Sequence, residues 1–123
     1  MQKLGPHKKR PEPKPRPTSA VVYDLVAHLH RQREFSLNTF GPGYSTSRIL
    51  DHVRHELTEI EAAPKDLEEW IDLMMLAADG AWRAGYSPEQ IAAMLDIKLT
   101  KNEQRDWPDW READPNKAIE HIK

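Results

Sequence analysis

Two pairs of carboxylates, with the members of each pair three residues apart, are the sequence feature that most constrains this chain. Glu56 and Glu59 form the first pair, and Glu69 and Asp72 form the second. Residues three apart share a face of an α-helix, and both pairs lie within stretches whose apolar residues recur at helical spacing. An ionised carboxylate against an apolar core is costly unless something compensates its charge. The pattern therefore predicts helices whose carboxylates share a compensating partner.

The short stretch between the two pairs predicts an antiparallel helical hairpin with the carboxylates facing each other. It contains Pro64, which suits the first turn of a helix, so we expect the second helix to run from Pro64 to about Ala84 and to end near Gly85. Several carboxylates that converge on one gap cannot all stay ionised without cations. The chain has no Cys, and oxygen ligands suit Mg²⁺ or Mn²⁺ better than zinc or copper. Asp79, seven residues after Asp72, is a further candidate in the metal site, either as a ligand or behind the ligands.

The rest of the pattern also predicts helices, with no strand-like alternation. A helix is expected over about 18–34, followed by a loop over 35–47 around a Gly-Pro-Gly turn. Residues 87–90 form a capping box with Pro88 at the first helical position, so another helix starts there. A short terminal helix is expected from Asp114. The prediction is an all-α protein, a four-helix bundle with a short C-terminal helix.

Composition divides the 123 residues into a tail and one domain. Residues 1–17 hold six Lys or Arg, one Glu and five Pro, so we expect a disordered basic tail before a domain over 18–123. Such a tail contacts phosphates weakly, and no specific nucleic-acid binding is expected. Hydrophobic residues make up only 38%, which favours an oligomer, a homodimer or homotetramer. No apolar segment long enough for a membrane is present, and a cytoplasmic location is expected.

Two groups of residues are candidates for contacts with a phosphorylated ligand. If the helix that starts at Pro88 continues, Lys98, Asn102 and Arg105 share a face on which two cations and an amide suit a polyphosphate; the alternative is a solvated basic helix end. The aromatic residues of the 35–47 loop either pack beneath it or surround a nucleobase. In the second case Arg33, Asn38 and Phe40 take part.

Taken together, these motifs resemble the MazG-like all-α nucleoside triphosphate pyrophosphohydrolases. The resemblance rests on the two carboxylate pairs, on Lys98, Asn102 and Arg105, and on the amino-acid sequences of the flanking segments, such as 31–43, 66–85 and 102–110. Within that superfamily the chain is most similar to the phage and bacterial dATP/dGTP pyrophosphohydrolases. One departure is visible, since many members have an acid where His55 precedes Glu56.

The resemblance implies hydrolysis of dGTP or dATP to the monophosphate and pyrophosphate. Mg²⁺ or Mn²⁺ would be held by Glu56, Glu59, Glu69 and Asp72, with one of the glutamates acting as base. Lys98 and Arg105 would stabilise the leaving pyrophosphate. Such an activity would remove excess nucleotides or, in the host cytoplasm if the chain is phage-encoded, supply dGMP to a pathway that makes a modified purine. Two alternatives stay open from the residues alone: a non-catalytic helical module that binds a divalent cation or a basic partner, and a carboxylate-bridged redox centre.

Overall fold

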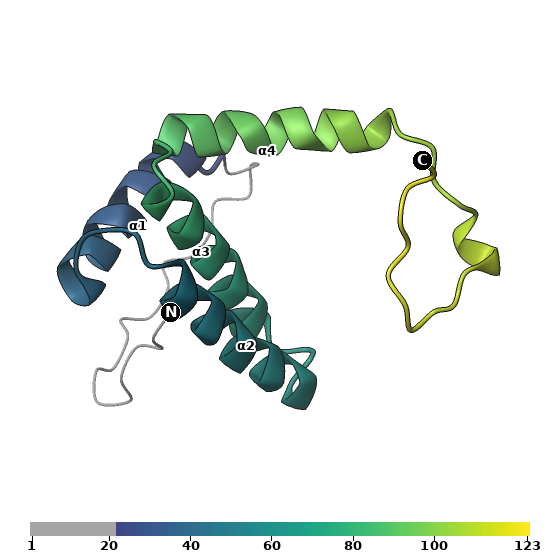
Figure 1. Cartoon of the computed structure of the whole chain (residues 1–123), viewed down its shortest axis with the longest axis horizontal. Coiled ribbons are helices and arrows are strands. Elements are labelled where there is room, and N and C mark those ends of the chain that lie inside the picture. The colour runs from purple at the N-terminus through teal and green to yellow at the C-terminus, as the bar shows by residue number, and fades with distance from the viewer. Residues whose placement is uncertain (1–21) are drawn as a thin grey trace. The chain divides into compact units, whose positions relative to one another are not determined.

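The computed structural model describes residues 22–123, which form four α-helices and one turn of 3-10 helix (Figure 1). In chain order these are α1 (Leu25–Phe40), α2 (Thr46–Ala62), α3 (Leu67–Arg83), α4 (Pro88–Glu103) and η1 (Trp110–Glu112). No strand occurs in this part of the chain. The prediction of an all-α protein with four main helices is therefore confirmed. None of the helices described is both long and apolar enough to cross a membrane.

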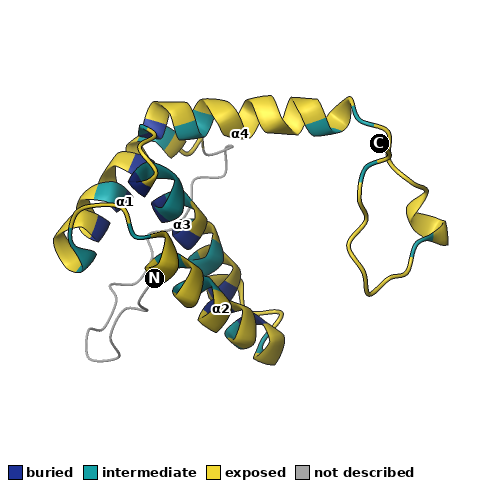
Figure 2. Cartoon of the chain, viewed as in Figure 1, coloured by how far each residue is buried: buried dark blue, intermediate teal, exposed yellow. Residues whose placement is uncertain are grey.

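Contacts divide the chain into two units at Ile91, and α3 is the central helix of the first unit. It packs along α2 and also against α1 (Figure 1). The apolar core of this unit is small, because only Leu29, Ile60 and Leu76 are buried hydrophobic side chains among the described residues. Polar and charged side chains are buried beside them: Gln32, Ser36, Glu56, Glu69, Asp79 and Arg83 (Figure 2). Since buried polar groups need partners, their contacts largely determine how these helices fit together.

The structure places α1 later in the chain than the sequence predicted. The helix begins after Asp24, whose Oδ1 accepts a hydrogen bond from the backbone N–H of Ala27 at 3.0 Å. The first residues of the predicted 18–34 helix lie outside the described part, but 22–24 are not helical, so the predicted start is wrong. The predicted loop is also too long, since residues 35–40 are helical. The helix stops at Gly41, whose φ of 87° is the left-handed conformation that glycine adopts most easily.

The predicted start of α3 at Pro64 is wrong by three residues. Asp66 is the N-cap, and its Oδ1 accepts a hydrogen bond from a backbone N–H of the first turn at 3.0 Å, so the helix begins at Leu67. Pro64 lies in the turn that precedes it. The other end agrees with the prediction, because α3 ends at Arg83 and Gly85 has a φ of 108°.

α2 and α3 lie close together at Gly80. A Cβ atom added to Gly80 would meet Cγ2 of Ile49 on α2 at 3.6 Å, an ordinary van der Waals distance. The glycine therefore marks a contact between the two helices, but the contact leaves room for a methyl group.

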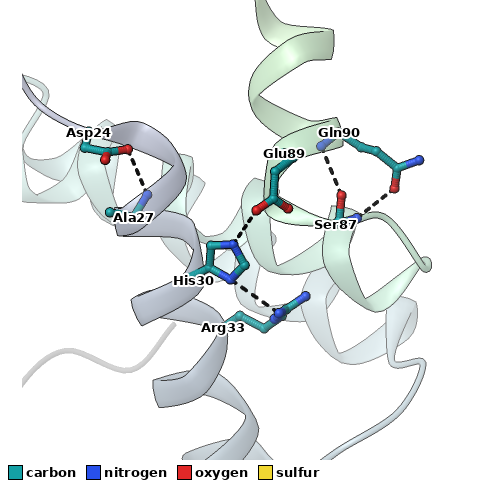
Figure 3. A network of polar contacts seen from close by, with 7 residues as sticks. All are labelled: Asp24, Ala27, His30, Arg33, Ser87, Glu89 and Gln90. Atoms are coloured by element: carbon teal, nitrogen blue, oxygen red, sulfur yellow. Dashed lines mark hydrogen bonds and ion pairs between the residues drawn. The ribbon is translucent and has the colours of Figure 1, made fainter.

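The capping box that starts α4 is formed as predicted. Ser87 Oγ accepts a hydrogen bond from the backbone N–H of Gln90 at 3.1 Å, and Gln90 Oε1 accepts one from the backbone N–H of Ser87 at 2.9 Å. Pro88 is the first helical residue. The backbone N–H groups of Ser87 and Gln90, which have no partner within the helix, are thereby satisfied (Figure 3).

The second unit, residues 92–123, contains most of α4 and the segment that follows it. The backbone N–H of Ile122 donates to the carbonyl of Asp106 at 2.8 Å, and the rings of Trp107 and His121 meet edge to face, so the C-terminal segment folds back on itself. The predicted terminal helix from Asp114 is wrong. Asp114 Oδ1 accepts a hydrogen bond from the backbone N–H of Asn116, and the chain there forms only a turn. The helical turn that follows α4 is instead η1.

Candidate metal centre and its surroundings

Three glutamates from two helices converge beside the core of the first unit. Glu56 and Glu59 come from α2 and Glu69 from α3, and each offers a carboxylate oxygen within 4.8 Å of the other two. Glu56 and Glu69 are buried and Glu59 is half-buried. The linker between the helices is only four residues long, which brings the end of α2 back beside the start of α3. The two carboxylate pairs of the sequence therefore meet across one helical hairpin.

Electrostatics at this cluster disfavours full ionisation. Burial raises the pKa of Glu56 to about 7, and hydrogen bonding with Glu59 and Glu69 and the negative charge of Asp72 act in the same direction. Asp72 itself is half-buried on α3. A cluster of this kind retains a proton near neutral pH unless a cation replaces it.

The donor set fits a hard divalent cation. All candidate ligand atoms are carboxylate oxygens, which Mg²⁺ and Mn²⁺ favour. Glu56 Oε2 is buried and has no hydrogen-bond partner within the described residues. A buried carboxylate oxygen without a donor is destabilising by itself, and a coordinated cation would remove that cost.

Asp79, the further metal candidate of the sequence, has different neighbours in the structure. It is 1% exposed, and its carboxylate accepts hydrogen bonds from Gln32 Nε2 at 3.2 Å, Ser36 Oγ at 2.7 Å and Trp82 Nε1 at 3.1 Å. It is not among the three residues whose oxygens converge. Three donors already satisfy this carboxylate, so we propose that Asp79 anchors α1 to α3 in place of a role as metal ligand.

Phe40 lies at the end of α1 and is packed between two rings. It contacts Phe35 at 6.3 Å and His52 of α2 at 6.1 Å between ring centroids, both edge to face. Burial lowers the pKa of His52, which favours the neutral imidazole. His52 lies one helical turn before Glu56, so Phe40 borders the side of α2 that leads to the carboxylates. Asn38 is exposed in the last turn of α1.

Arg33 lies on another face of α1, beside the start of α4. Its Nη2 is 3.4 Å from His30 Nδ1, and His30 Nε2 is 2.6 Å from Glu89 Oε1 (Figure 3). Both residues line an open groove of about 730 Å³ together with Arg31, Glu34, Leu37 and Trp82. None of the converging glutamates lines it. The structure therefore does not bring Arg33 to the carboxylates within the first unit.

The cationic candidates of α4 lie together in the second unit. Arg105 Nη1 donates to Asn102 Oδ1 at 3.0 Å, and the positive charge of Arg105 lowers the pKa of Lys98. Both Lys98 and Asn102 are helical, and Arg105 follows the end of α4. The three residues therefore lie close together within this unit, but Arg105 lies beyond the end of α4, so the helix does not continue as far as the predicted face requires. An approach of these groups to the carboxylates stays a prediction.

Sequence reasoning missed three buried polar residues, namely Gln32, Ser36 and Arg83. A signal was present, because Gln32 and Ser36 continue the spacing of Leu25 and Leu29 along α1. Polar residues at core positions of a helix predict buried hydrogen bonds, although not which partners they take.

A comparison with known proteins gives one match. The family model described as dATP/dGTP pyrophosphohydrolase matches residues 28–123, which include the three converging glutamates, Asp72 and the cationic face of α4. No curated protein and no solved structure matches the chain. The match covers more than half of the sequence and agrees with an all-helical structure in which two carboxylate pairs meet. The chain belongs to the dATP/dGTP pyrophosphohydrolase family.

Proposed function

We propose that this protein hydrolyses purine deoxynucleoside triphosphates, dGTP or dATP, between the α- and β-phosphorus atoms. The products are the deoxynucleoside monophosphate and pyrophosphate. The observation that carries the proposal is the convergence of Glu56, Glu59 and Glu69 within 4.8 Å, inside the region that matches the family. A carboxylate cluster of this kind suits a reaction whose substrate arrives with divalent cations on its phosphates.

Glu56, Glu59, Glu69 and Asp72 would hold Mg²⁺ or Mn²⁺. When bound, the cation supplies positive charge that offsets the phosphate oxygens and makes a neighbouring water more acidic. One of the glutamates accepts the proton of the attacking water as its oxygen bonds to the α-phosphorus and the bond to the pyrophosphate oxygen breaks.

Other residues would bind the remaining parts of the substrate. Lys98, Asn102 and Arg105 are proposed to contact the leaving pyrophosphate, since cationic and amide groups suit a polyphosphate and Arg105 lies within hydrogen-bond distance of Asn102. Phe40 and Asn38, at the end of α1, are proposed to border the nucleoside. Arg33 is the weakest member of the predicted set, because it lines a groove that the converging glutamates do not share.

The test is a product analysis with purified protein. Each deoxynucleoside triphosphate is incubated with Mg²⁺, with Mn²⁺ or with EDTA, and the products are separated by ion-exchange chromatography. Monophosphate and pyrophosphate formed only with metal, and mainly from dGTP or dATP, are the expected result. Diphosphate and phosphate would mean that another bond is cleaved. Metal binding without turnover would support the non-catalytic module instead.

Glu69→Gln tests the ligand assignment. The amide keeps the shape of the side chain but loses the negative charge, so we expect kcat to fall by about 1,000-fold or more, the range found when a central catalytic interaction is removed. Thermal unfolding of the metal-free variant should occur at or above the wild-type temperature, because a buried like charge has been removed. Glu61→Gln, an exposed neighbour on α2, is the matched control and should retain activity. Full activity of Glu69→Gln would contradict the assignment.

A further inference from the structure

Arg83, the last residue of α3, holds the loop between α1 and α2 from inside the protein. Its Nη1 donates to the carbonyl oxygens of Gly41 at 2.8 Å and Gly43 at 3.1 Å. Its Nη2 donates to Ser36 Oγ on α1 at 3.0 Å. The arginine is buried. One guanidinium therefore joins α3, α1 and the loop over residues 41–45.

Ser36 connects this arginine to a carboxylate of opposite charge. A serine hydroxyl has one hydrogen and two acceptor positions. Ser36 donates that hydrogen to Asp79 Oδ2 at 2.7 Å and accepts from Arg83 at 3.0 Å, and it is fully buried. Asp79 is fixed further by Gln32 and Trp82. Because a buried charge is tolerated only when its partners are in place, this network restrains the direction in which the guanidinium points.

The two glycines of the loop that Arg83 holds have little conformational preference of their own. Gly41 and Gly43 have φ values of 87° and 101°, and glycine is the residue that populates such angles and many others with similar ease. Of the five loop residues, Tyr44 is 75% exposed and contributes little packing. The position of this segment relative to α2 therefore depends on hydrogen bonds from outside the loop. Gly41 and Gly43 accept two from Arg83, and Phe40, just before the loop, accepts one from Arg48 of α2 at 3.0 Å.

That position matters because Phe40, next to the loop, contacts α2 one helical turn before Glu56. Phe40 precedes the loop and contacts His52 on α2. His52 lies about 6 Å along α2 from Glu56, given the rise of an α-helix. A nucleotide whose phosphates lie at the glutamates and whose nucleoside extends toward the start of α2 would meet residues 40–44.

We propose that Arg83, together with Ser36 and Asp79, acts as a positioning group that fixes residues 40–44 as the wall beside the substrate nucleoside. The proposal rests on the proposed function, in which the substrate is a deoxynucleoside triphosphate at the glutamate cluster. Arg83 itself touches no reacting atom. Its effect is on where the nucleoside binds, so it acts on substrate affinity and selectivity more than on the chemical step.

Steady-state kinetics of Ser36→Ala and Arg83→Lys test this role. Ser36→Ala removes the hydroxyl that links Arg83 to Asp79. Arg83→Lys keeps the positive charge but loses the planar fork, whose Nη1 reaches the loop carbonyls while Nη2 reaches Ser36. We expect KM for the preferred deoxynucleotide to rise by about fivefold or more in both variants, with kcat changed by no more than about twofold, as for a lost hydrogen bond to a charged group. Arg54→Lys on the exposed face of α2 is the control. Equal KM values in folded variants and control would overturn the proposal.

Limited proteolysis with chymotrypsin gives a second test, which does not depend on activity. Tyr44 and Tyr23 are both exposed and non-helical, at 75% and 67% exposure. If Arg83 fixes the loop, wild-type protein should be cleaved after Tyr44 about tenfold more slowly than after Tyr23, since cleavage needs local opening. Faster cleavage after Tyr44 is expected in Ser36→Ala. Equal rates at the two sites in wild-type protein would overturn the positioning role, whereas absent turnover with a protected Tyr44 would count against the proposed function alone.

Discussion

At the scale of single residues, the protonation of Glu56 is the property with the widest consequences. Its pKa is raised from 4.5 to about 7, first by burial and then by the neighbouring carboxyl groups. The carboxylate pattern itself could be predicted from sequence, because spacing by three on a helix is a local property. Which of the acids is most deeply buried could not, since that depends on how α2 and α3 pack. Asp79 shows the same limit. Its spacing from Asp72 suggested a metal site, but two of its three hydrogen-bond donors, Gln32 and Ser36, come from α1.

We predict that the metal-free protein loses stability as pH rises from about 5 to 8. The folded-state pKa of Glu56 lies above its ordinary value, so the folded protein binds the proton more tightly, and that contribution is lost as pH passes through about 7. The loss amounts to at most about 3.5 kcal/mol, since one pKa unit corresponds to about 1.4 kcal/mol. Urea unfolding in EDTA at several pH values measures it. Glu56→Gln should flatten the profile, and added Mg²⁺ or Mn²⁺ should restore wild-type stability at pH 8. A flat profile in the wild type would contradict the burial of this charge.

At the scale of helices, the predicted helix ends were correct in some places and wrong in others. The capping box at Ser87 was predicted correctly because both of its hydrogen bonds connect residues three apart in sequence. The end of α1 was not, because Ser36 lies within a segment of loop-like composition and is held in the helix by a contact with Asp79 on α3. Local hydrogen bonds did not make every helix start predictable, because Asp24 and Asp66 cap α1 and α3 through residues two or three away, while Pro64 gave a competing start signal for α3.

Asp66→Ala tests the start of α3, the helix that carries Glu69 in its first turn. Loss of the N-cap hydrogen bond should lower the free energy of unfolding by about 1 kcal/mol. Fraying of that turn should also weaken divalent cation binding, because Glu69 is then held less firmly. Urea unfolding and calorimetric titration with Mn²⁺ measure the two effects. Asp51→Ala, an exposed position inside α2, should change neither. Unchanged stability of Asp66→Ala would show that the cap is dispensable.

At the scale of the whole molecule, the described residues bury few apolar side chains and expose many. Leu29, Ile60 and Leu76 are buried, while one face of α3 leaves Leu67 70% and Met74 67% exposed. A core this small is marginal for a domain of this size. We propose that a second copy of the chain covers this face of α3, which agrees with the oligomer that the low hydrophobic content of the sequence suggested.

Met74→Glu tests that proposal. A carboxylate at the centre of an apolar contact is costly, so the variant should sediment as a smaller species at the same protein concentration while its helical circular dichroism is retained. Thr58→Glu adds the same charge to the polar side of α2, where Arg54 and Glu61 are also exposed, and should leave the mass unchanged. An unchanged mass for Met74→Glu would mean that this face is not the contact.

The spacing between α2 and α3 at Gly80 also bears on how this protein is best engineered. A methyl group there would meet Ile49 Cγ2 at 3.6 Å, so Gly80→Ala adds a contact without forcing the helices apart. Alanine also restricts the unfolded chain, and the substitution should raise the free energy of unfolding by about 0.5 to 1 kcal/mol. Chemical denaturation measures the gain, and a loss of stability would show that the helices approach more closely than 3.6 Å implies. A single methyl group in the last turn of α3 thus offers a stiffer scaffold whose three converging glutamates are left unaltered.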